Sequence, residues 1–112
     1  MTAPRLNRKL VLEAPLRLSD GGGGFTATWQ PLGTVWAQVT ARTGRETIER
    51  DAPVSQMRYR IVVRNAPFGS PQRPKPDQRF RDNDRYFLIR AVAEDDAEGR
   101  YLSCFATEET AL

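Results

Sequence analysis

The sequence predicts an all-β protein, a small antiparallel β-barrel of about six strands. Two observations lead to this prediction. Apolar and polar residues alternate at period 2 through much of the 112-residue chain, as in half-buried strands. Turn-forming residues separate these stretches, and no long helical pattern lies between them. We expect a single domain, residues 1–112, with a modest core.

The stretches with strand-like alternation follow one another along the chain. The clearest is MRYRIVVR, in which apolar residues at odd positions alternate mainly with arginines. Gly99 precedes the last stretch, in a turn where glycine suits a positive φ angle. The expected strands are 9–15, 25–31, 34–39, 57–64, 85–93 and 100–107.

Two segments break the strand pattern. TGRETIERDAPVSQ (43–56) is polar, and we expect a long polar loop or a short helix that Pro53 terminates. A long loop in a small domain is often functional. NAPFGSPQRPKPDQRF (65–80) is rich in proline, which predicts a stiff connector across one end of the barrel or a proline-rich ligand for another domain.

Four consecutive glycines precede the stretch FTATWQ. A phosphate-binding glycine loop requires a following helix, whereas here a predicted strand follows. Asp-Gly is instead a strong turn dipeptide. We therefore expect a long, adaptable hairpin tip. This candidate flexible contact tip consists of Asp20, Gly21, Gly22, Gly23 and Gly24.

The composition excludes several classes of catalytic and metal site. The chain has no histidine and a single cysteine, so it has no Ser-His or Cys-His nucleophile, no imidazole or multi-thiolate metal site and no intrachain disulfide. Cys104, Trp29 and Trp36 are expected in the core, and an exposed tryptophan would be an interface anchor. We expect no enzyme activity and no cofactor or metal. We also expect no membrane partner, because no apolar stretch approaches about 20 residues.

Charge is distributed unevenly along the chain. Residues 57–90 carry nine Lys or Arg against three Asp or Glu, whereas residues 91–112 carry one against six. Such segregation suits head-to-tail pairing of copies or a basic face for a polyanion. Two solvated strands with opposite charges would show the same pattern.

The ordered set of motifs resembles the bacteriophage head–tail joining family, also called head-closure or stopper proteins. The similarity covers nearly the whole chain. Its most specific part is SDGGGGFTATWQPLGTVWAQV, and RLNRKLVLEAP, TGRE, MRYRIVVR, RYFLIRAV and a last strand with Cys104 complete the order. The chain departs from the family in its longer glycine tip and in the proline-rich stretch.

The resemblance implies a structural β-barrel that assembles, in six or twelve copies, as a ring in the virion neck of a phage, prophage or gene transfer particle. Its partners would be sister copies, portal and adaptor proteins, tail terminator or tail proteins, and packaged double-stranded DNA. The ring would assemble in the bacterial cytoplasm. Segment 43–56 would be the inward loop that narrows the channel. The candidate gating residues are Arg42, Thr43, Gly44, Arg45, Glu46, Glu49, Arg50 and Asp51.

The arginines of this segment have two possible partners. They would bind DNA phosphates in a salt-sensitive way, or pair with the neighbouring acids on a solvated helix. Elsewhere, arginine suits bidentate pairing with carboxylates across a subunit interface. The candidate interface residues are Arg58, Arg60, Arg64, Asp95, Asp96 and Glu98.

The second functional hypothesis is a single-stranded nucleic-acid-binding barrel. Arginines interleaved with aromatic residues suit stacking on unpaired bases. The residues concerned are Arg58, Arg60, Arg64, Arg79, Arg81, Arg85, Tyr59 and Tyr86.

Overall fold

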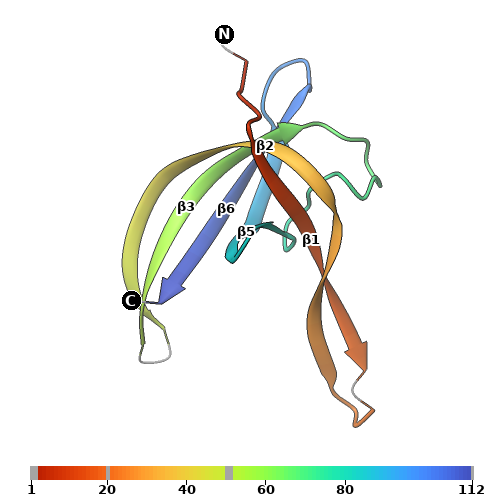
Figure 1. Ribbon diagram of the computed structural model, residues 1–112, viewed down its shortest axis with the longest axis vertical. Helices are drawn as coiled ribbons and strands as arrows, with labels where there is room; N and C mark the ends of the chain where they lie inside the picture. Colours follow the sequence, from red (N-terminus) through yellow and green to blue (C-terminus); the bar gives the residue numbers. More distant parts are fainter. Residues whose placement is uncertain (1–2, 20, 50–51, 112) are drawn as a thin grey trace.

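Six strands form one closed antiparallel barrel in the computed structural model (Figure 1). The backbone is described for residues 3–19, 21–49 and 52–111, and the side chains for the same residues except 25–27, 43–49, 52–55 and 110–111. The strands are β1 (Arg8–Ser19), β2 (Phe25–Glu49), β3 (Ala52–Arg64), β4 (Arg79–Asp82), β5 (Arg85–Glu94) and β6 (Tyr101–Ala111). Their order around the barrel is β1-β2-β3-β6-β5-β4, and β4 pairs back onto β1. The predicted antiparallel barrel is confirmed.

Two hairpins extend beyond the barrel body as arms (Figure 1). The first arm is residues 14–30 of β1 and β2, which β4 does not reach because it pairs only with Val11 to Glu13. The second arm is residues 43–56 of β2 and β3, with the end of β6 alongside. The arms give a radius of gyration of 15.4 Å, against about 13 Å for a compact chain of this length.

The expectation of a loop or helix over 43–56 is wrong. The backbone there is paired β-structure, from Thr43↔Arg58 to Glu49↔Ala52. A hairpin that projects past the barrel has no core beneath it, so its sequence lacks the apolar alternation that identifies a half-buried strand. No helix in the described part of the chain has the length and apolar character needed to span a membrane.

The expected strands 25–31 and 34–39 are one continuous strand, β2. Leu12 opposes Gly33 and Glu13 opposes Pro31, so Leu32 is a bulged extra residue and the chain does not turn. The prediction also missed β4, a four-residue strand. The other expected strands are confirmed as parts of β1, β3, β5 and β6.

Both predicted connections are found. Ser19 opposes Phe25 across the glycine tip, where Gly21 and Gly23 adopt positive φ angles, so the hairpin is confirmed. Residues 65–78 join β3 to β4, which β6 and β5 separate in the barrel, so the proline-rich connector does cross the barrel end. Gly99 has φ +66° in the turn before β6, also as predicted.

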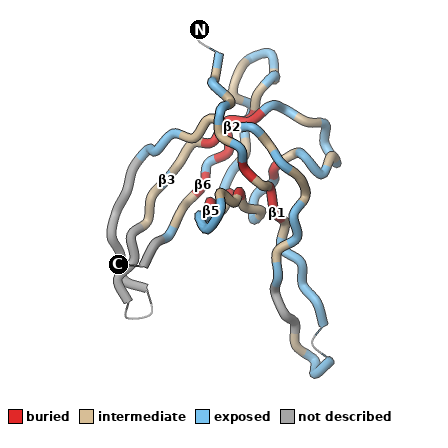
Figure 2. Tube along the Cα trace, viewed as in Figure 1, coloured by how far each residue is buried: buried red, intermediate tan, exposed pale blue. Residues whose placement is uncertain are grey.

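The core fills the barrel body, and the described parts of the arms lie outside it (Figure 2). Cys104 is fully buried, as predicted. Trp29 and Trp36 are not in the core, and Trp36 is 55% exposed, so that expectation is wrong. The buried cluster is Leu10, Leu12, Ala37, Ile61, Val63, Phe80, Phe87, Ile89, Leu102, Cys104 and Ala106.

The Cys104 thiol is expected to be inert in the folded protein. Burial raises its pKa to about 12, and the reactive thiolate is therefore scarce at neutral pH. A maleimide reagent at pH 7.5 should label native protein slowly and urea-unfolded protein at once, as followed by mass spectrometry. Rapid, complete labelling of the native protein would show that the barrel opens around β6.

Candidate functional site

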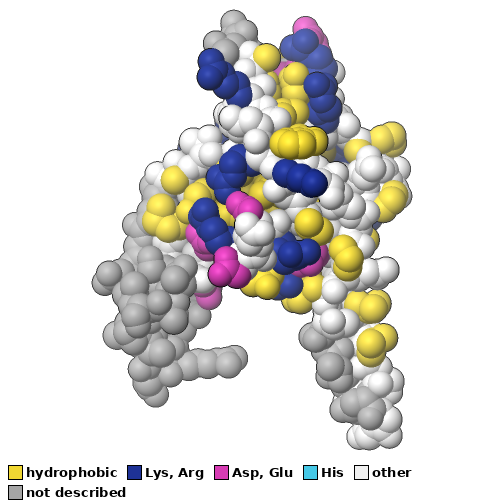
Figure 3. All heavy atoms as spheres, viewed as in Figure 1, with side chains coloured by type: hydrophobic (Ala, Val, Ile, Leu, Met, Phe, Trp, Pro, Cys, Tyr) yellow, Lys and Arg dark blue, Asp and Glu magenta, His cyan; other side chains and the backbone are white. Residues whose placement is uncertain are grey.

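The surface arginines of the barrel fall into two groups, those with a carboxylate partner and those without. The partnered arginines are Arg8, Arg60, Arg79, Arg81, Arg85 and Arg100. Arg42, Arg58 and Arg90 have no carboxylate within ion-pair distance among the described side chains. Basic and acidic side chains accordingly lie close together on the barrel body (Figure 3). The unpartnered group is the one available to another molecule.

Glu13 holds two arginines at the base of the first arm. Its carboxylate accepts hydrogen bonds from Nε of Arg79 at 2.7 Å and of Arg81 at 2.9 Å. The β1–β4 register places Glu13 opposite Arg79, and Glu13 is only 5% exposed. Burial alone would raise the pKa of this carboxyl, but the two arginines outweigh it and hold the pKa below 4.5.

Arg79 lies between two aromatic rings. Its guanidinium carbon is 4.0 Å from the ring centroid of Trp29 in the first arm and 4.1 Å from that of Tyr86 in β5. Cation–π contacts of this kind favour arginine over lysine. Trp29 therefore anchors the arm to the barrel surface through Arg79, which explains why it lies outside the core.

A second ion pair joins β3, β5 and β6. Nε of Arg85 donates to Glu108 at 2.8 Å, and the Tyr59 hydroxyl donates to the same carboxylate at 3.1 Å. The Arg85 hydrogen bond lowers the pKa of Glu108, whereas burial and then Glu108 raise the pKa of Tyr59. These contacts sit beside the buried Phe87, whose ring meets Tyr59 edge-on at 5.0 Å.

Four of the six predicted interface residues form ion pairs within the chain. Arg60 pairs with Asp95 inside the same chain, and Asp95 also accepts a hydrogen bond from the buried Ser103. Asp96 and Glu98 both pair with Arg100 in the β5–β6 turn. The ion pairs of Arg60, Asp95 and Asp96 therefore stabilise the β5–β6 turn within one chain.

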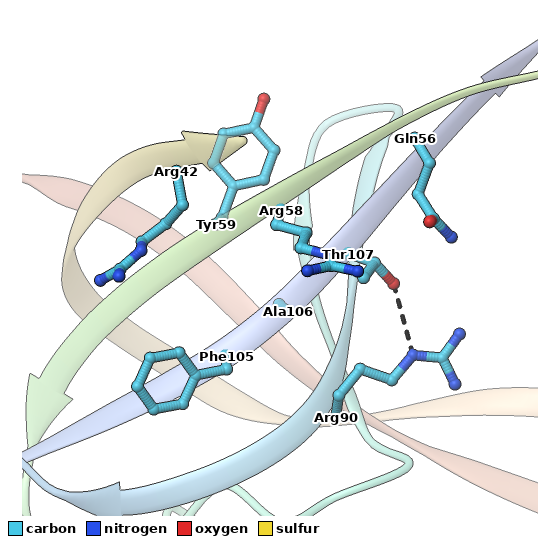
Figure 4. A pocket seen from close by; sticks show the side chains of 8 residues that line it. All are labelled: Arg42, Gln56, Arg58, Tyr59, Arg90, Phe105, Ala106 and Thr107. Carbon is cyan, nitrogen blue, oxygen red and sulfur yellow. Dashed lines mark hydrogen bonds between the residues drawn. The ribbon is translucent and has the colours of Figure 1, made fainter. Parts of the chain in front are cut away.

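The two remaining arginines of that set stay exposed. Arg64 lies 6.0 Å from the Tyr101 ring at the end of β3. Arg58 lines a hollow of about 580 Å³ on the outer face of the barrel, where β2, β3, β6 and β5 run side by side. Figure 4 shows this arginine hollow, which is lined by Arg42, Gln56, Arg58, Tyr59, Arg90, Phe105, Ala106 and Thr107.

Two β-bulges bring arginines to the hollow. The β2–β3 pairing shifts register at Arg42, and the β5–β6 pairing shifts at Arg90, so neither has a directly opposed residue. Bulges commonly re-aim side chains in this way. Arg58 lies between them on β3, and Arg90 Nε donates to the Thr107 hydroxyl at 3.4 Å.

The sequence prediction missed Arg90 and Phe105. A signal for the bulge does exist, because the inward residues of β5 are Ile89 and Val92, three positions apart where regular alternation requires two. Phe105 is 39% exposed and gives the hollow an apolar wall. Its outward position follows once the core positions of its neighbours Cys104 and Ala106 are known.

The predicted gating residues occupy the second arm. Arg42 lies at its base in the arginine hollow, while the backbone of Thr43, Gly44, Arg45, Glu46 and Glu49 is paired with β3. Arg50 and Asp51 lie outside the described residues, as does Asp20 of the glycine tip.

The first arm also exposes apolar side chains. Leu16 is 38% and Leu18 50% exposed, and Figure 3 shows hydrophobic side chains along this arm. Among the described residues, no group of three acids or cysteines is placed to hold a metal ion.

The arginine array proposed for single-stranded nucleic acid is largely engaged. Arg60, Arg79, Arg81 and Arg85 each pair with a carboxylate of the same chain. An arginine neutralised in this way offers less to a phosphate backbone. The geometry thus favours the alternative in which these arginines hold the barrel together.

Comparison with known proteins identifies clear relatives. Residues 1–109 match the family described as phage head completion protein. A chain from the virion of a native gene transfer agent particle superimposes with a TM-score of 0.90 at 52% sequence identity. The alignment covers 98% of the present chain and 100% of that chain. No curated protein sequence matches the chain.

Proposed function

The chain belongs to the phage head completion protein family, and from this membership we propose that it is a neck protein, one that forms a ring between the portal and adaptor and the tail. Membership of this family supports a structural role at the phage head or neck. The proposed location is the virion of a phage or gene transfer particle, at the head–tail junction.

One observation carries the proposal. A protein 52% identical over almost the whole chain is a component of a gene transfer agent virion, and its fold matches at a TM-score of 0.90. Similarity of this extent, without a missing or added domain in the matched chain, supports a corresponding place in a particle. The arms and the unpartnered arginines supply the contact surfaces such a place requires.

In this proposal the second arm reaches toward the channel. Its described strands, residues 43–49 and 52–56, project from the barrel as a hairpin. Arg45 and Arg50 would contact the phosphates of packaged DNA, with salt-sensitive affinity. Arg42, at the base of the arm, lies in the arginine hollow instead. Six or twelve copies would make the ring, with portal, adaptor and tail proteins as neighbours.

The location is tested with a gold-labelled C-terminal tag viewed by electron microscopy. We expect the label at the head–tail junction of purified particles, and a deletion strain should produce heads without attached tails. Label spread over the capsid or along the tail would contradict a neck role.

Gating is tested by shortening the second arm. Glu46 and Ser55 are directly opposed, so replacing residues 47–54 with Asn-Gly should close the hairpin with a two-residue turn. We expect particles that assemble but lose nuclease-protected DNA, because the shortened arm no longer narrows the channel. The matched control replaces residues 20–24 of the first arm with Asn-Gly between Ser19 and Phe25. Equal DNA retention in both variants would argue against gating by the second arm.

A further inference from the structure

We propose that the arginine hollow binds the acidic β5–β6 turn, residues 94–98, of a second copy of this chain. This inference rests on the proposed function, because it specifies the contact by which copies would join into a ring. The arginines of the hollow would recognise carboxylates of the second copy. The contact would join the outer face of one barrel to the β5–β6 turn of the next.

The hollow is arranged for an anion. Arg42, Arg58 and Arg90 come from three strands and line one space, with no carboxylate partner among the described side chains. Like charges brought together repel one another, and an anion between them relieves that repulsion. Glu109 lies opposite Gln56 in the β3–β6 pairing, and its carboxylate accepts a hydrogen bond from Gln56 at 3.2 Å. It forms no ion pair with the three arginines.

The shape of the hollow favours a peptide over DNA. Its volume of about 580 Å³ suits a few side chains, and its three arginines line one bounded hollow instead of a continuous track for a phosphate backbone. Phe105, which is 39% exposed, adds apolar contact area, which suits the mixed polar and apolar surface of a peptide turn. Guanidinium groups also match carboxylates in planar, bidentate geometry.

The β5–β6 turn presents carboxylates of the required kind. Asp95 and Asp96 are held within the chain by Arg60 and Arg100, and these pairs fix the shape of the turn. Glu98 pairs with Arg100 at 2.9 Å, but its side chain remains 68% exposed, and Glu94 is exposed as well. A rigid turn with two projecting carboxylates loses little conformational freedom on docking.

The turn and the hollow of one chain cannot meet each other. The turn ends at residue 100, and Phe105 lies five residues further along β6, about 17 Å in an extended strand. The β5–β6 ladder between them is continuous apart from one bulge. Contact therefore requires two copies, and a contact between different surfaces of identical chains generates a ring when its rotation closes.

Cysteine crosslinking tests the contact in the full-length protein. Gln56 lines the hollow and Ala97 is exposed in the turn, and neither carries a charge. The variant with both Gln56→Cys and Ala97→Cys is treated with a short bis-maleimide in purified particles and as concentrated purified protein. Cys104 is buried and serves as an internal unreactive thiol.

We expect a ladder of crosslinked multimers from the double-cysteine variant and none from either single-cysteine variant. Adding Arg58→Glu and Arg90→Glu should reduce the ladder at least about tenfold, because like charges then face each other. Adding Glu94→Arg and Glu98→Arg to the variant with Arg58→Glu and Arg90→Glu should restore the ladder, because opposite charges face each other again. Arg58→Lys with Arg90→Lys, which keeps the charge, should retain part of it.

Several outcomes would overturn the inference. Absence of the ladder both in particles and in purified protein rejects the contact, and if the tagged chain still lies at the neck, the proposed function stands. A crosslink from position 56 to a different virion protein would overturn the inference, because that protein and not a second copy would then occupy the hollow. Salt-dependent retention of a 30-base-pair duplex on filters, lost on Arg58→Glu with Arg90→Glu and without any ladder, assigns the hollow to DNA.

Discussion

Replacing Phe87 with alanine is expected to lower the free energy of unfolding by about 3–5 kcal/mol. Phe87 is fully buried in β5, and its ring packs against Tyr59 at 5.0 Å. The barrel is closed, so the surrounding strands cannot easily collapse into the cavity that the truncation leaves. Because domains are typically stable by only about 5–15 kcal/mol, this loss should bring the variant close to unfolding at 37 °C.

Phe68→Ala is the matched control, since it deletes the same side-chain atoms at a position that is 86% exposed. Its ring contacts the guanidinium of Arg73 at 3.8 Å, a surface contact whose loss should change stability by about 0.5 kcal/mol or less. Urea unfolding followed by tryptophan fluorescence measures both midpoints. Equal midpoints for the two variants would show that the core does not depend on Phe87.

The barrel was predictable because its core strands repeat one simple pattern. In β3, Tyr59, Ile61 and Val63 face inward while Arg58 and Arg60 face outward, and the sequence shows this alternation directly. In a closed barrel one face of each strand lies on the core. Apolar and polar residues therefore alternate along each strand wherever the barrel has an interior.

The second arm could not be predicted in the same way. Beyond the barrel body a hairpin has no interior side, and polar residues such as those of 43–49 are compatible with strand, helix or loop. What makes this segment a strand is its hairpin pairing with β3, which its hydrophobic period and composition do not encode. The strand β4 was missed for a related reason, because four residues are too few to display a period.

The arginine hollow was only partly predictable. Arg58 was a candidate from charge and Arg42 from the family resemblance, but their meeting with Arg90 depends on two bulges and on the order of the strands. Charge segregation along the chain indicated pairing between basic and acidic segments. It could not indicate that Arg60 and Asp95 satisfy each other within one chain.

Glu13→Gln is expected to cost about 2–3 kcal/mol of stability at pH 7, since the change leaves two partly buried guanidinium groups without their carboxylate. Arg79 and Arg81 are the two arginines, with side chains 18% and 35% exposed. The amide of glutamine can still accept one hydrogen bond, but it carries no charge. The loss would also loosen the first arm, because Arg79 is the group on which Trp29 stacks.

The effect of this substitution should depend on pH in a defined direction. The pKa of Glu13 in the folded protein lies below its ordinary value of 4.5, so its stabilising contribution is complete above that value and disappears as pH falls through the lowered pKa. The stability difference between the native protein and Glu13→Gln should therefore be largest at pH 7 and shrink as the pH falls below 4.5. Urea titrations at pH 7, 5, 4 and 3 measure it.

Glu94→Gln controls for the general effect of removing a negative charge, since Glu94 is exposed and forms no ion pair with the described residues. Its stability should stay within about 0.5 kcal/mol of the native protein at every pH. A pH-independent cost for Glu13→Gln would mean that packing, and not charge, is what Glu13 contributes. A cost that shrinks in acid means that Glu13 fixes the first arm through its charge, so the arm's orientation would weaken at low pH.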